Sequence, residues 1–510
     1  MLRTLNAAYE SIVATNAAPA AMWEATLRLR RRAGLMVTLG LLLFGVAWLA
    51  HLSYTSLSPP TDNIEQLIWL HSLEWGYYKH PPLPTWLVWA MAQLFGVHAW
   101  TSYLAGAALT LGSVGMLWCL LSQLRGRRYA TLALLAVLCI TYYNGRLNYC
   151  NHNIVLMFWA AVSAGVCWRA CTTGRLRWWL ALGAALGLGA LSKYQIAVTM
   201  VSVLSFWLHQ RGWRNAKQRC GILTAALVAL LICVPHLLWL RTHDFGPLQY
   251  ARESSLGAHL SMGRRWADAL HWTADQLLNR AMPAWLLLAA ALYVGRQRVG
   301  AAPLSAPVAS HGNADGRARA LLLSWGLVPL MFMPLVGILT GADLQFQWGT
   351  AFLLFAVPAA MELAGSRATW SRAPLRPTLK VFITLQLLLL IQSHLASPRG
   401  PEALRDRHWR SFDSEALARR LEGPARLALS GRAICVVSGP DSEAGALALQ
   451  LTDRPLVLID GRFDRSPWIS ADQIKRCGVL ELNRGTLPDG QPVGADFAGL
   501  WWRVIPPEGR

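Results

Sequence analysis

The sequence predicts a polytopic α-helical membrane protein of about eleven transmembrane helices with a soluble α/β domain at its C-terminal end. Hydrophobic residues make up 54% of the chain and charged residues only 15%. Apolar runs such as the one that starts at Gly34 are long enough to cross ~30 Å of hydrocarbon. Beyond Ala396 the composition changes to a mixture of charged and apolar residues, which is typical of a soluble domain.

The candidate transmembrane spans are apolar runs of about 17 to 25 residues, with a few shorter ones. They lie at residues 34–52, 100–122, 129–143, 153–170, 178–192, 194–209, 220–240, 282–297, 319–341, 347–364 and 379–395. We expect these helices to form one membrane domain over residues 34–395, after a cytoplasmic segment of residues 1–33.

The formal net charge of +20 does not indicate nucleic-acid binding, because the basic residues fall in short clusters between the spans. Every second connection carries such a cluster: Arg28, Arg30, Arg31 and Arg32, then Arg125, Arg127 and Arg128, then Arg169, Arg175 and Arg177, then Arg211, Arg214, Lys217 and Arg219, with later clusters near residues 296–319 and 367–380. The positive-inside rule makes these connections cytoplasmic and places the C-terminus on the opposite side. Residues 53–100, 144–151 and 241–281 are then outer connections.

Residues 396–510 form the predicted outer domain. A strand from Ile434, a helix from Ser442 and a strand from Pro455 are typical of a β-α-β unit, and a further apolar run covers residues 478–482. The unit has no glycine-rich phosphate loop, so acceptor binding and a purely stabilising role both stay open. Cys435 and Cys477 could pair in an oxidising compartment. Residues 300–316 are predicted to be a flexible cytoplasmic linker.

Ionisable residues are concentrated between Asp62 and Pro82. This stretch, here called the 62–82 segment, reads DNIEQLIWLHSLEWGYYKHPP. Ionisable groups beside a membrane are costly to keep, so a cluster of them indicates function. Asp62 and Glu65 lie one helical turn apart if residues 64–75 form an interfacial helix. The alternative is structural, with Asp62 capping the N-terminus of that helix.

The pattern D-x(12)-W-G-Y-Y-K-H-P-P-L resembles the first outer loop of polyprenyl-phosphate-dependent membrane glycosyltransferases of the GT-C class. It is most similar to the bacterial relatives of the dolichyl-phosphate-mannose protein mannosyltransferases. Matching pieces follow in order over about residues 34–365: LMFWAAVSAGVCWRA, GLGALSKY, PHLLWLRTHDF and QWGTAFLLFAVPAAMEL. Two positions depart from the family pattern, because Asn63 and the run Asn151, His152, Asn153 stand where carboxylates are common.

The resemblance implies an inverting enzyme that moves a sugar from a polyprenyl-phosphate donor to an acceptor hydroxyl at the outer face of a bacterial inner membrane. Asp62 would be the general base, with Glu65 as a second catalytic carboxylate. The cations expected at the lipid phosphate are Lys79, then Lys193, with Arg146 and Arg265 behind them. His80 and the pair His243 and Asp244 are further substrate-binding candidates, although interfacial lysines and arginines also anchor proteins to headgroups.

No cofactor follows from these residues, and a divalent cation stays open. His80, His152 and His243 would bind zinc only if the fold brought them together. The predicted partners are the lipid-linked donor, a lipid, glycan or protein acceptor, and the membrane, without nucleic acid. A non-enzymatic translocase of lipid-linked sugars, or a scaffold of envelope assembly, is the alternative. Transporters usually place polar groups at the bilayer midplane and show repeats, whereas this chain gathers them on one face.

Overall fold

The computed structural model describes residues 32–299, 312–365, 369–370, 373–406 and 408–508. The chain divides into two units, residues 1–47 and residues 48–510. Most of the predicted N-terminal segment, residues 1–31, lies outside the described residues. The predicted domain boundaries at residues 33 and 395 stay predictions.

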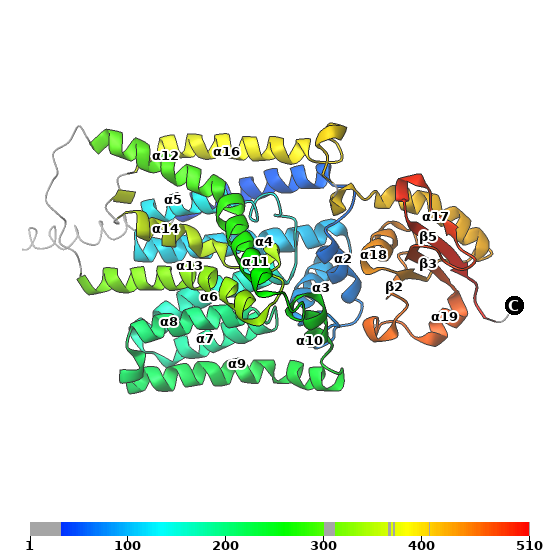
Figure 1. Cartoon of the computed structure of the whole chain (residues 1–510), viewed down its shortest axis with the longest axis horizontal. Helices are drawn as coiled ribbons and strands as arrows, with labels where there is room; N and C mark the ends of the chain where they lie inside the picture. The colour runs from blue at the N-terminus through cyan, green and yellow to red at the C-terminus, as the bar shows by residue number, and fades with distance from the viewer. Residues whose placement is uncertain (1–31, 300–311, 366–368, 371–372, 407, 509–510) are drawn as a thin grey trace, which may run out of the picture. The chain divides into compact units, whose positions relative to one another are not determined.

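Six helices of the described part are long and apolar enough to cross a membrane, judged by length and composition. They are Arg32–Thr55, α4 (Ala99–Leu124), α6 (His152–Thr173), α9 (Ala216–Thr242), α13 (Gly312–Thr340) and α16 (Leu375–Leu395). A bent pair of helices, Met262–Arg280 with Met282–Gly295, would be a seventh span, with an angle of 53° at its break. The chain is therefore a multi-pass helical protein, as predicted (Figure 1).

The other predicted spans correspond to shorter helices. These are α5 (Arg127–Val137), α7 (Leu176–Ala190), α8 (Ile196–His209), α12 (Met282–Val299) and α14 (Ala356–Ala364), with the short helix η1 (Gly212–Arg214) between α8 and α9. The runs 129–143 and 347–364 are not single helices, so these two predictions were wrong. The second run begins instead with the 3-10 turns η4 (Phe346–Gly349) and η5 (Leu353–Phe355).

Tyrosine hydroxyls join the irregular parts of those two runs. The hydroxyl of Tyr142 donates to the carbonyl of Phe346 at 2.6 Å, and that of Tyr143 donates to the carbonyl of Thr350 at 2.8 Å. Both carbonyls are thereby bound to partners outside their own helix. Irregular backbone inside a membrane is stable only where protein covers it or where it lines a cavity. The broken runs supply part of the wall of the cavity described below.

The 62–82 segment folds as helix α2 (Thr61–Trp69) followed by a loop, and α3 (Leu83–Phe95) comes next. The predicted helix over residues 64–75 is thus too long by six residues. Asp62 is not the cap either, because Pro60 holds that position and no side chain caps the helix. Backbone hydrogen bonds in both directions between Tyr77 and His80, at 3.0 and 3.2 Å, close a tight turn with Tyr78 and Lys79 at its tip.

The connection after α9 contains four short elements. They are α10 (Gly246–Ala251), the π-helix η2 (Arg252–Leu256), α11 (Met262–Ala274) and the π-helix η3 (Asp275–Arg280). The predicted linker over residues 300–316 is corrected at its end, because α13 already starts at Gly312; residues 300–311 lie outside the described part. Alanine and arginine dominate residues 317–320, and both are good helix formers.

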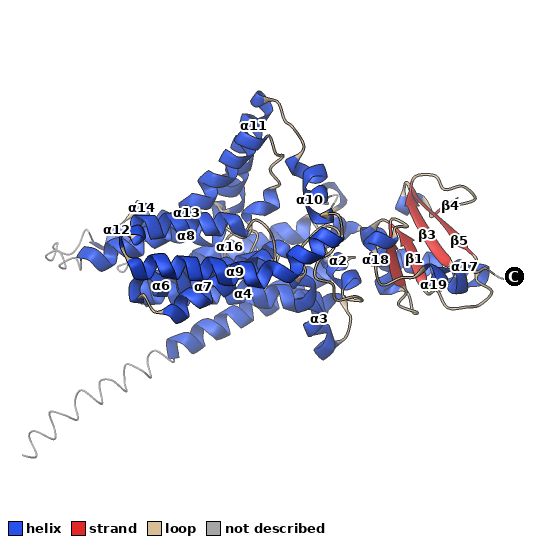
Figure 2. Ribbon diagram, turned by 90° about the horizontal axis from the view of Figure 1, so that it is seen from below, coloured by secondary structure: helices blue, strands red, loops and turns tan. Residues whose placement is uncertain are grey.

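The C-terminal α/β domain, residues 414–505, contains a five-stranded sheet in the order β2-β1-β3-β5-β4 (Figure 2). The strands are β1 (Val436–Gly439), β2 (Leu456–Ile459), β3 (Val479–Arg484), β4 (Gln491–Pro492) and β5 (Leu500–Ile505), and the helices are α17 (Ser414–Ala428), α18 (Asp441–Gln450) and α19 (Ala471–Cys477). Strand β1 pairs in parallel with β2 and β3, while β5 is antiparallel to β3 and β4. The predicted β-α-β unit is confirmed as β1-α18-β2.

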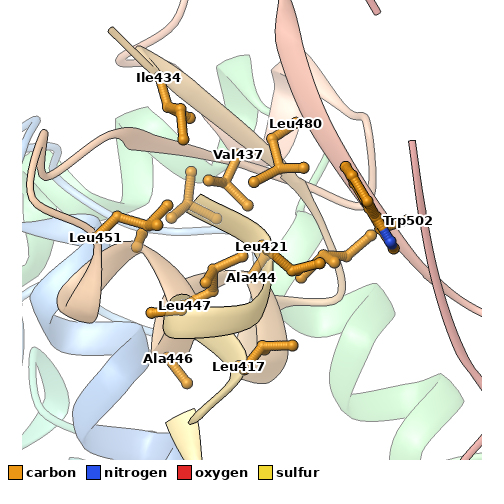
Figure 3. Packing of buried hydrophobic residues seen from close by; sticks show 14 of the residues in the cluster. Leu417, Leu421, Ile434, Val437, Ala444, Ala446, Leu447, Leu451, Leu480 and Trp502 are labelled. Atoms are coloured by element: carbon orange, nitrogen blue, oxygen red, sulfur yellow. The ribbon is translucent and has the colours of Figure 1, made fainter. Parts of the chain in front are cut away.

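The hydrophobic core of the α/β domain includes residues from outside that domain. Leu417 and Leu421 of α17, Leu447 of α18 and Leu480 of β3 pack together, as Figure 3 shows. The same buried cluster includes Ile64, Ile68, Trp69 and Tyr77 from the 62–82 segment. Helix α2 therefore buries one face against the α/β domain, although the two are more than 300 residues apart in sequence.

Cys435 and Cys477 are both free thiols in the structure. The register that pairs Val437 with Leu480 places Cys435 opposite Gly478, next to Cys477. Burial, and after it a hydrogen bond with the Cys477 thiol, raises the pKa of Cys435 to about 11. The thiols are thus neighbours, and their pairing stays a prediction.

Candidate functional site

A cavity of about 190 Å³ lies beside the N-terminal end of α2. It is lined by four stretches of chain that are distant in sequence: Thr61 and Asp62; Tyr142, Arg146, Tyr149, Asn151 and Ile154; Gln347 and Thr350; His408 and Trp409. Two of the predicted site residues, Asp62 and Arg146, share this cavity. Residues from two of the predicted outer connections, 53–100 and 144–151, thus meet at one place.

A hydrogen bond fixes the Asp62 carboxylate at the wall of the cavity. Asn151 Nδ2 donates to Asp62 Oδ2 at 2.7 Å. The other side-chain atom of this amide, Asn151 Oδ1, caps α6 by accepting from the backbone N–H groups of Asn153 and Ile154 at 3.1 and 3.0 Å. Because the cap orients the amide, its NH₂ group must point at Asp62. An asparagine does this where a carboxylate would repel Asp62.

Asn63 joins α2 to α4 and to the stretch of chain that precedes α6. Its Nδ2 donates to Ser102 Oγ and to the carbonyl of Asn148, both at 2.8 Å, and its Oδ1 accepts from the Cys150 N–H at 2.9 Å. The side chain is fully buried, so these bonds satisfy polar atoms that water cannot reach. This position has a structural role in the described fold.

Arg146 presents its guanidinium to the cavity between two aromatic rings. The guanidinium carbon lies 5.5 Å from the centre of the Tyr142 ring and 5.4 Å from that of Tyr149. Within the described part of the chain, no carboxylate forms an ion pair with it. A half-buried, preorganised cation of this kind is suited to bind an anionic oxygen.

Lys193 lies in the turn between α7 and α8 and is the second cation near Asp62. Its Nζ donates to Asn153 Oδ1 at 2.8 Å and lies 5.8 Å from the centre of the Trp348 ring. Burial lowers the pKa of Lys193 to about 8, and the nearby charge of Asp62 opposes that shift. The amine is thus a hydrogen-bond donor whose charge depends on pH near the physiological range.

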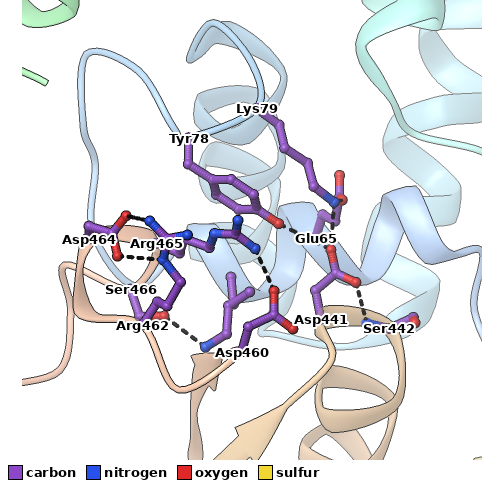
Figure 4. Close-up of polar contacts among 11 residues, drawn as sticks. Glu65, Tyr78, Lys79, Asp441, Ser442, Asp460, Arg462, Asp464, Arg465 and Ser466 are labelled. Atoms are coloured by element: carbon purple, nitrogen blue, oxygen red, sulfur yellow. Dashed lines mark hydrogen bonds and ion pairs between the residues drawn. The ribbon is translucent and has the colours of Figure 1, made fainter. Parts of the chain in front are cut away.

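Lys79 is at the tip of the Tyr77–His80 turn and is already paired. Its Nζ donates to Asp441 Oδ2 at 2.6 Å and also to Glu65 Oε1 (Figure 4). Burial lowers the pKa of Lys79, but Glu65 and Asp441 outweigh this effect and raise it above its ordinary value. Lys79 is not among the residues that line the cavity around Asp62.

Glu65 and Asp441 share Lys79 unequally. Burial raises the pKa of Glu65 to about 8, because the attraction of Lys79 offsets only part of the effect of burial. Burial also disfavours the charge on Asp441, yet Lys79 holds the pKa of that carboxyl below its usual range. At neutral pH Asp441 therefore carries the negative charge, and Glu65 is mostly protonated.

This difference predicts a pH dependence of stability that Glu65→Gln removes. Between about pH 4.5 and about pH 8 the folded state holds a proton on Glu65 that the unfolded chain releases. The stability that the raised pKa of Glu65 contributes is fully present below about pH 4.5, and it is lost as the pH rises through about 8. We expect the thermal midpoint of the wild type to fall more steeply over this range than that of Glu65→Gln. Glu415→Gln, which alters an exposed ion pair with Arg419, is the control; parallel curves for the wild type and Glu65→Gln would contradict the assignment.

Two of the three histidines considered for zinc do converge. The rings of His80 and His152 have their centres 3.9 Å apart. His243 instead stacks on Trp239, with ring centres 4.2 Å apart. Burial, followed by the charges of His152, Lys193 and Lys79, holds the pKa of His80 well below its usual range. No group of three or more His, Cys, Asp or Glu side chains that could hold a metal ion occurs among the described residues.

Arg265 and Asp244 lie away from this cavity. The Arg265 guanidinium donates to the carbonyls of Leu260 and Ile338 at 2.7 and 3.2 Å, which ties α11 to the end of α13. Asp244 has a backbone φ of 49° in the turn after α9, and its carbonyl accepts from Gln249 Nε2 at 2.7 Å. The cavity lining includes neither residue, nor His243.

His408 and Trp409 are cavity residues that the sequence did not indicate. They precede α17 in a stretch assigned to the outer domain, and the 3-10 turn η7 (Trp409–Ser411) brings them over Tyr149. Trp409 Nε1 donates to the Tyr149 hydroxyl at 2.6 Å. Burial, and after it the charge of Arg146, lowers the pKa of His408 to about 4, so this imidazole is neutral. No motif marks these two residues in the sequence, where they stand between the last predicted span and α17.

The comparisons with known proteins agree with this picture. Residues 79–239 match the family model described as dolichyl-phosphate-mannose-protein mannosyltransferase. The lipopolysaccharide core galacturonosyltransferase RgtA of Rhizobium johnstonii is 25% identical over 342 residues, which are 64% of this chain and 65% of that protein. The undecaprenyl phosphate-α-4-amino-4-deoxy-L-arabinose arabinosyl transferase of Pseudomonas aeruginosa is 26% identical over 313 residues, or 58% of this chain and 54% of its own. Each match spans less than two thirds of the relative's length.

Among solved structures, ArnT from Cupriavidus metallidurans bound to undecaprenyl phosphate matches with a TM-score of 0.50 at 14% sequence identity. The match covers 92% of this chain and 97% of that chain. At this identity the likeness establishes the fold alone. The GT-C architecture predicted from the sequence is confirmed.

Proposed function

We propose that this chain, a relative of the dolichyl-phosphate-mannose-protein mannosyltransferases with a GT-C fold, is an inverting glycosyltransferase of a bacterial inner membrane. Its donor is a sugar on a polyprenyl phosphate and its acceptor is a hydroxyl group at the periplasmic face. The observation that carries this proposal is the cavity in which an oriented carboxylate, Asp62, lies together with the guanidinium of Arg146, which pairs with no carboxylate of the described residues.

The proposed chemistry requires a base and a cation on one cavity. Asp62 takes the proton of the acceptor hydroxyl while the acceptor oxygen attacks the anomeric carbon of the donor sugar. The bond between that carbon and the phosphate oxygen breaks, and the electron pair leaves with the polyprenyl phosphate. Arg146 and Lys193 stabilise the negative charge that grows on the phosphate. Attack from the face opposite the leaving group inverts the anomeric centre.

Glu65 and Lys79 have supporting roles in this proposal. Glu65 is largely protonated and bound to Lys79, so Asp62 is the better general base. Lys79 is neutralised by Asp441, which leaves Arg146 as the more accessible cation. His80 lies beside His152, with ring centres 3.9 Å apart, and the charges of Lys193 and Lys79 both lower its pKa.

The substrates proposed here follow the relatives in chemical class. One relative is named for an undecaprenyl phosphate-linked sugar and another for the lipopolysaccharide core. We therefore propose an undecaprenyl-phosphate sugar as donor and a lipopolysaccharide component as acceptor. The clusters of arginine and lysine between the spans support a cytoplasmic N-terminus and a periplasmic C-terminal α/β domain.

The test is transfer of a radiolabelled sugar from undecaprenyl phosphate to lipopolysaccharide by the purified full-length protein in detergent. A panel of neutral, uronic-acid and amino-sugar donors, each with and without a chelator, identifies the donor class and any need for a cation. We expect label to reach the acceptor and free undecaprenyl phosphate to appear in equal amount. Binding of the lipid without transfer from any donor would favour the translocase or scaffold.

A further inference from the structure

The C-terminal α/β domain reaches the 62–82 segment through a charged contact at the tip of the Tyr77–His80 turn. Asp441, the first residue of α18, accepts a hydrogen bond from Lys79 Nζ at 2.6 Å and one from the Tyr78 hydroxyl at 3.2 Å (Figure 4). Arg465 of the same domain lies over the Tyr78 ring, 4.9 Å from its centre. Side chains from the α/β domain thus hold both residues at the tip of the turn.

The same lysine continues the contact into α2. Lys79 donates to Glu65, which lies one helical turn after Asp62 on that helix. The chain of contacts therefore runs from Asp441 through Lys79 and Glu65 to the helix that carries the proposed base. The Lys79 side chain is only 15% exposed, so water screens its ion pair weakly.

Close apolar packing surrounds this charged contact. Helix α18 lies against α2 at Gly445, where a Cβ atom would overlap the side chains of Ile64 and Ile68. Trp69 and Tyr77, whose rings stack with centres 4.7 Å apart, belong to the same buried cluster as Leu447. The position of α2 is thus determined jointly by the membrane domain, through Asn63, and by the α/β domain.

We propose that Asp441 is a positioning residue for the transfer reaction: the α/β domain uses it, through Lys79 and Glu65, to hold α2 so that Asp62 faces the cavity. The effect of this contact on catalysis rests on the proposed function, whereas the contact itself is independent of it. It assigns the α/β domain a direct role in the reaction without requiring it to touch either substrate. Small displacements of a catalytic group have large effects on rate, because the reacting atoms must meet in a narrow range of geometries.

The competing account is that Lys79 binds the lipid phosphate during the reaction, and that Asp441 only occupies the position of that phosphate in its absence. Two observations favour the positioning role. Lys79 has two carboxylate partners, and its ammonium also lies 5.2 and 5.5 Å from the ring centres of Tyr78 and Tyr250. An anion that displaced Asp441 from Lys79 would leave the Asp441 carboxylate half-buried and without the lysine as its partner.

The experiment compares Asp441→Asn with Asp464→Asn in the full-length protein. Asp464 is an exposed aspartate of the same domain that pairs with Arg462 and forms no hydrogen bond or ion pair with the 62–82 segment among the described residues. We expect Asp441→Asn to lower kcat roughly 10- to 100-fold with little change in the KM of the donor. We also expect faster hydrogen exchange of the amides of residues 61–69 than in the wild type. Asp464→Asn should match the wild type in both measurements.

Two further variants keep the test decisive if Asp441→Asn folds poorly. Asp441→Glu retains the charge and should recover most of the turnover and amide protection. Gly445→Ala disturbs the same interface without touching a charge, and it should reproduce the loss of protection in residues 61–69. Agreement of these variants with Asp441→Asn would support positioning by the domain.

Other results would overturn the inference. If Asp441→Asn lowers the donor KM or raises turnover, Lys79 is a phosphate site from which Asp441 must be displaced. If its kcat and the exchange of residues 61–69 equal those of the wild type, the contact has no positioning role. A wild type that transfers no sugar would refute the proposed function alone, because the exchange measurement still tests the contact.

Discussion

Replacing Asp62 by asparagine is expected to reduce sugar transfer by about 10²- to 10⁴-fold, the usual contribution of a general base. Asparagine has the size of aspartate, but its neutral amide cannot take the proton of the acceptor hydroxyl. Asn151 Nδ2 can still donate to the remaining carbonyl oxygen at this position, so the contact with α6 is retained. The loss should therefore appear in kcat, with the thermal midpoint of the protein nearly unchanged.

The measurement is single-turnover transfer with enzyme in excess over donor, which separates the chemical step from product release. Asp496→Asn is the matched control, because Asp496 is 83% exposed in the α/β domain. Retained turnover in Asp62→Asn would exclude Asp62 as the base. Glu65→Gln, compared in the same assay, tests the second carboxylate, and its effect should be much smaller because Glu65 is already mostly protonated at neutral pH.

Replacing Arg146 by glutamine is expected to lower kcat/KM by about 10²- to 10³-fold, as is typical when a donor to developing negative charge is removed. Arg146 is held between the rings of Tyr142 and Tyr149 and has no carboxylate partner in the described structure, so its charge is available to the phosphate. Arg146→Lys should recover part of the activity, since lysine keeps the charge but loses the planar fork and the stacking.

The measurement compares kcat and KM for the lipid donor and the affinity for undecaprenyl phosphate itself. Weaker binding of undecaprenyl phosphate would place Arg146 at the phosphate. Unchanged binding of that product with a loss confined to one class of donor sugar would place Arg146 at the sugar instead. Arg419→Gln, at a residue whose side chain is 63% exposed on α17, is the control. Wild-type kinetics of Arg146→Gln would contradict both assignments.

The family resemblance depended on local sequence and was confirmed over residues 79–239. Hydrophobic runs located the long helices to within a few residues, because about twenty consecutive apolar residues have few alternatives to a membrane-spanning helix. The runs at 129–143 and 347–364 were misassigned because each contains irregular backbone beside its helix, and Tyr142 and Tyr143 join these irregular parts by binding carbonyls more than 200 residues away. Hydropathy does not record such long-range hydrogen bonds.

The sequence by itself determined the membrane-protein class and the β-α-β unit, and it predicted a site in the 62–82 segment, since all three follow from composition and local pattern. Tertiary structure decided how the ionisable residues are grouped. It placed Arg146 with Asp62, paired Lys79 with Asp441 of the C-terminal α/β domain, and brought His408 and Trp409 to the cavity. A charge acts on its neighbours in space, and the neighbours of these side chains come from segments up to 362 residues apart, so only the folded chain could specify them.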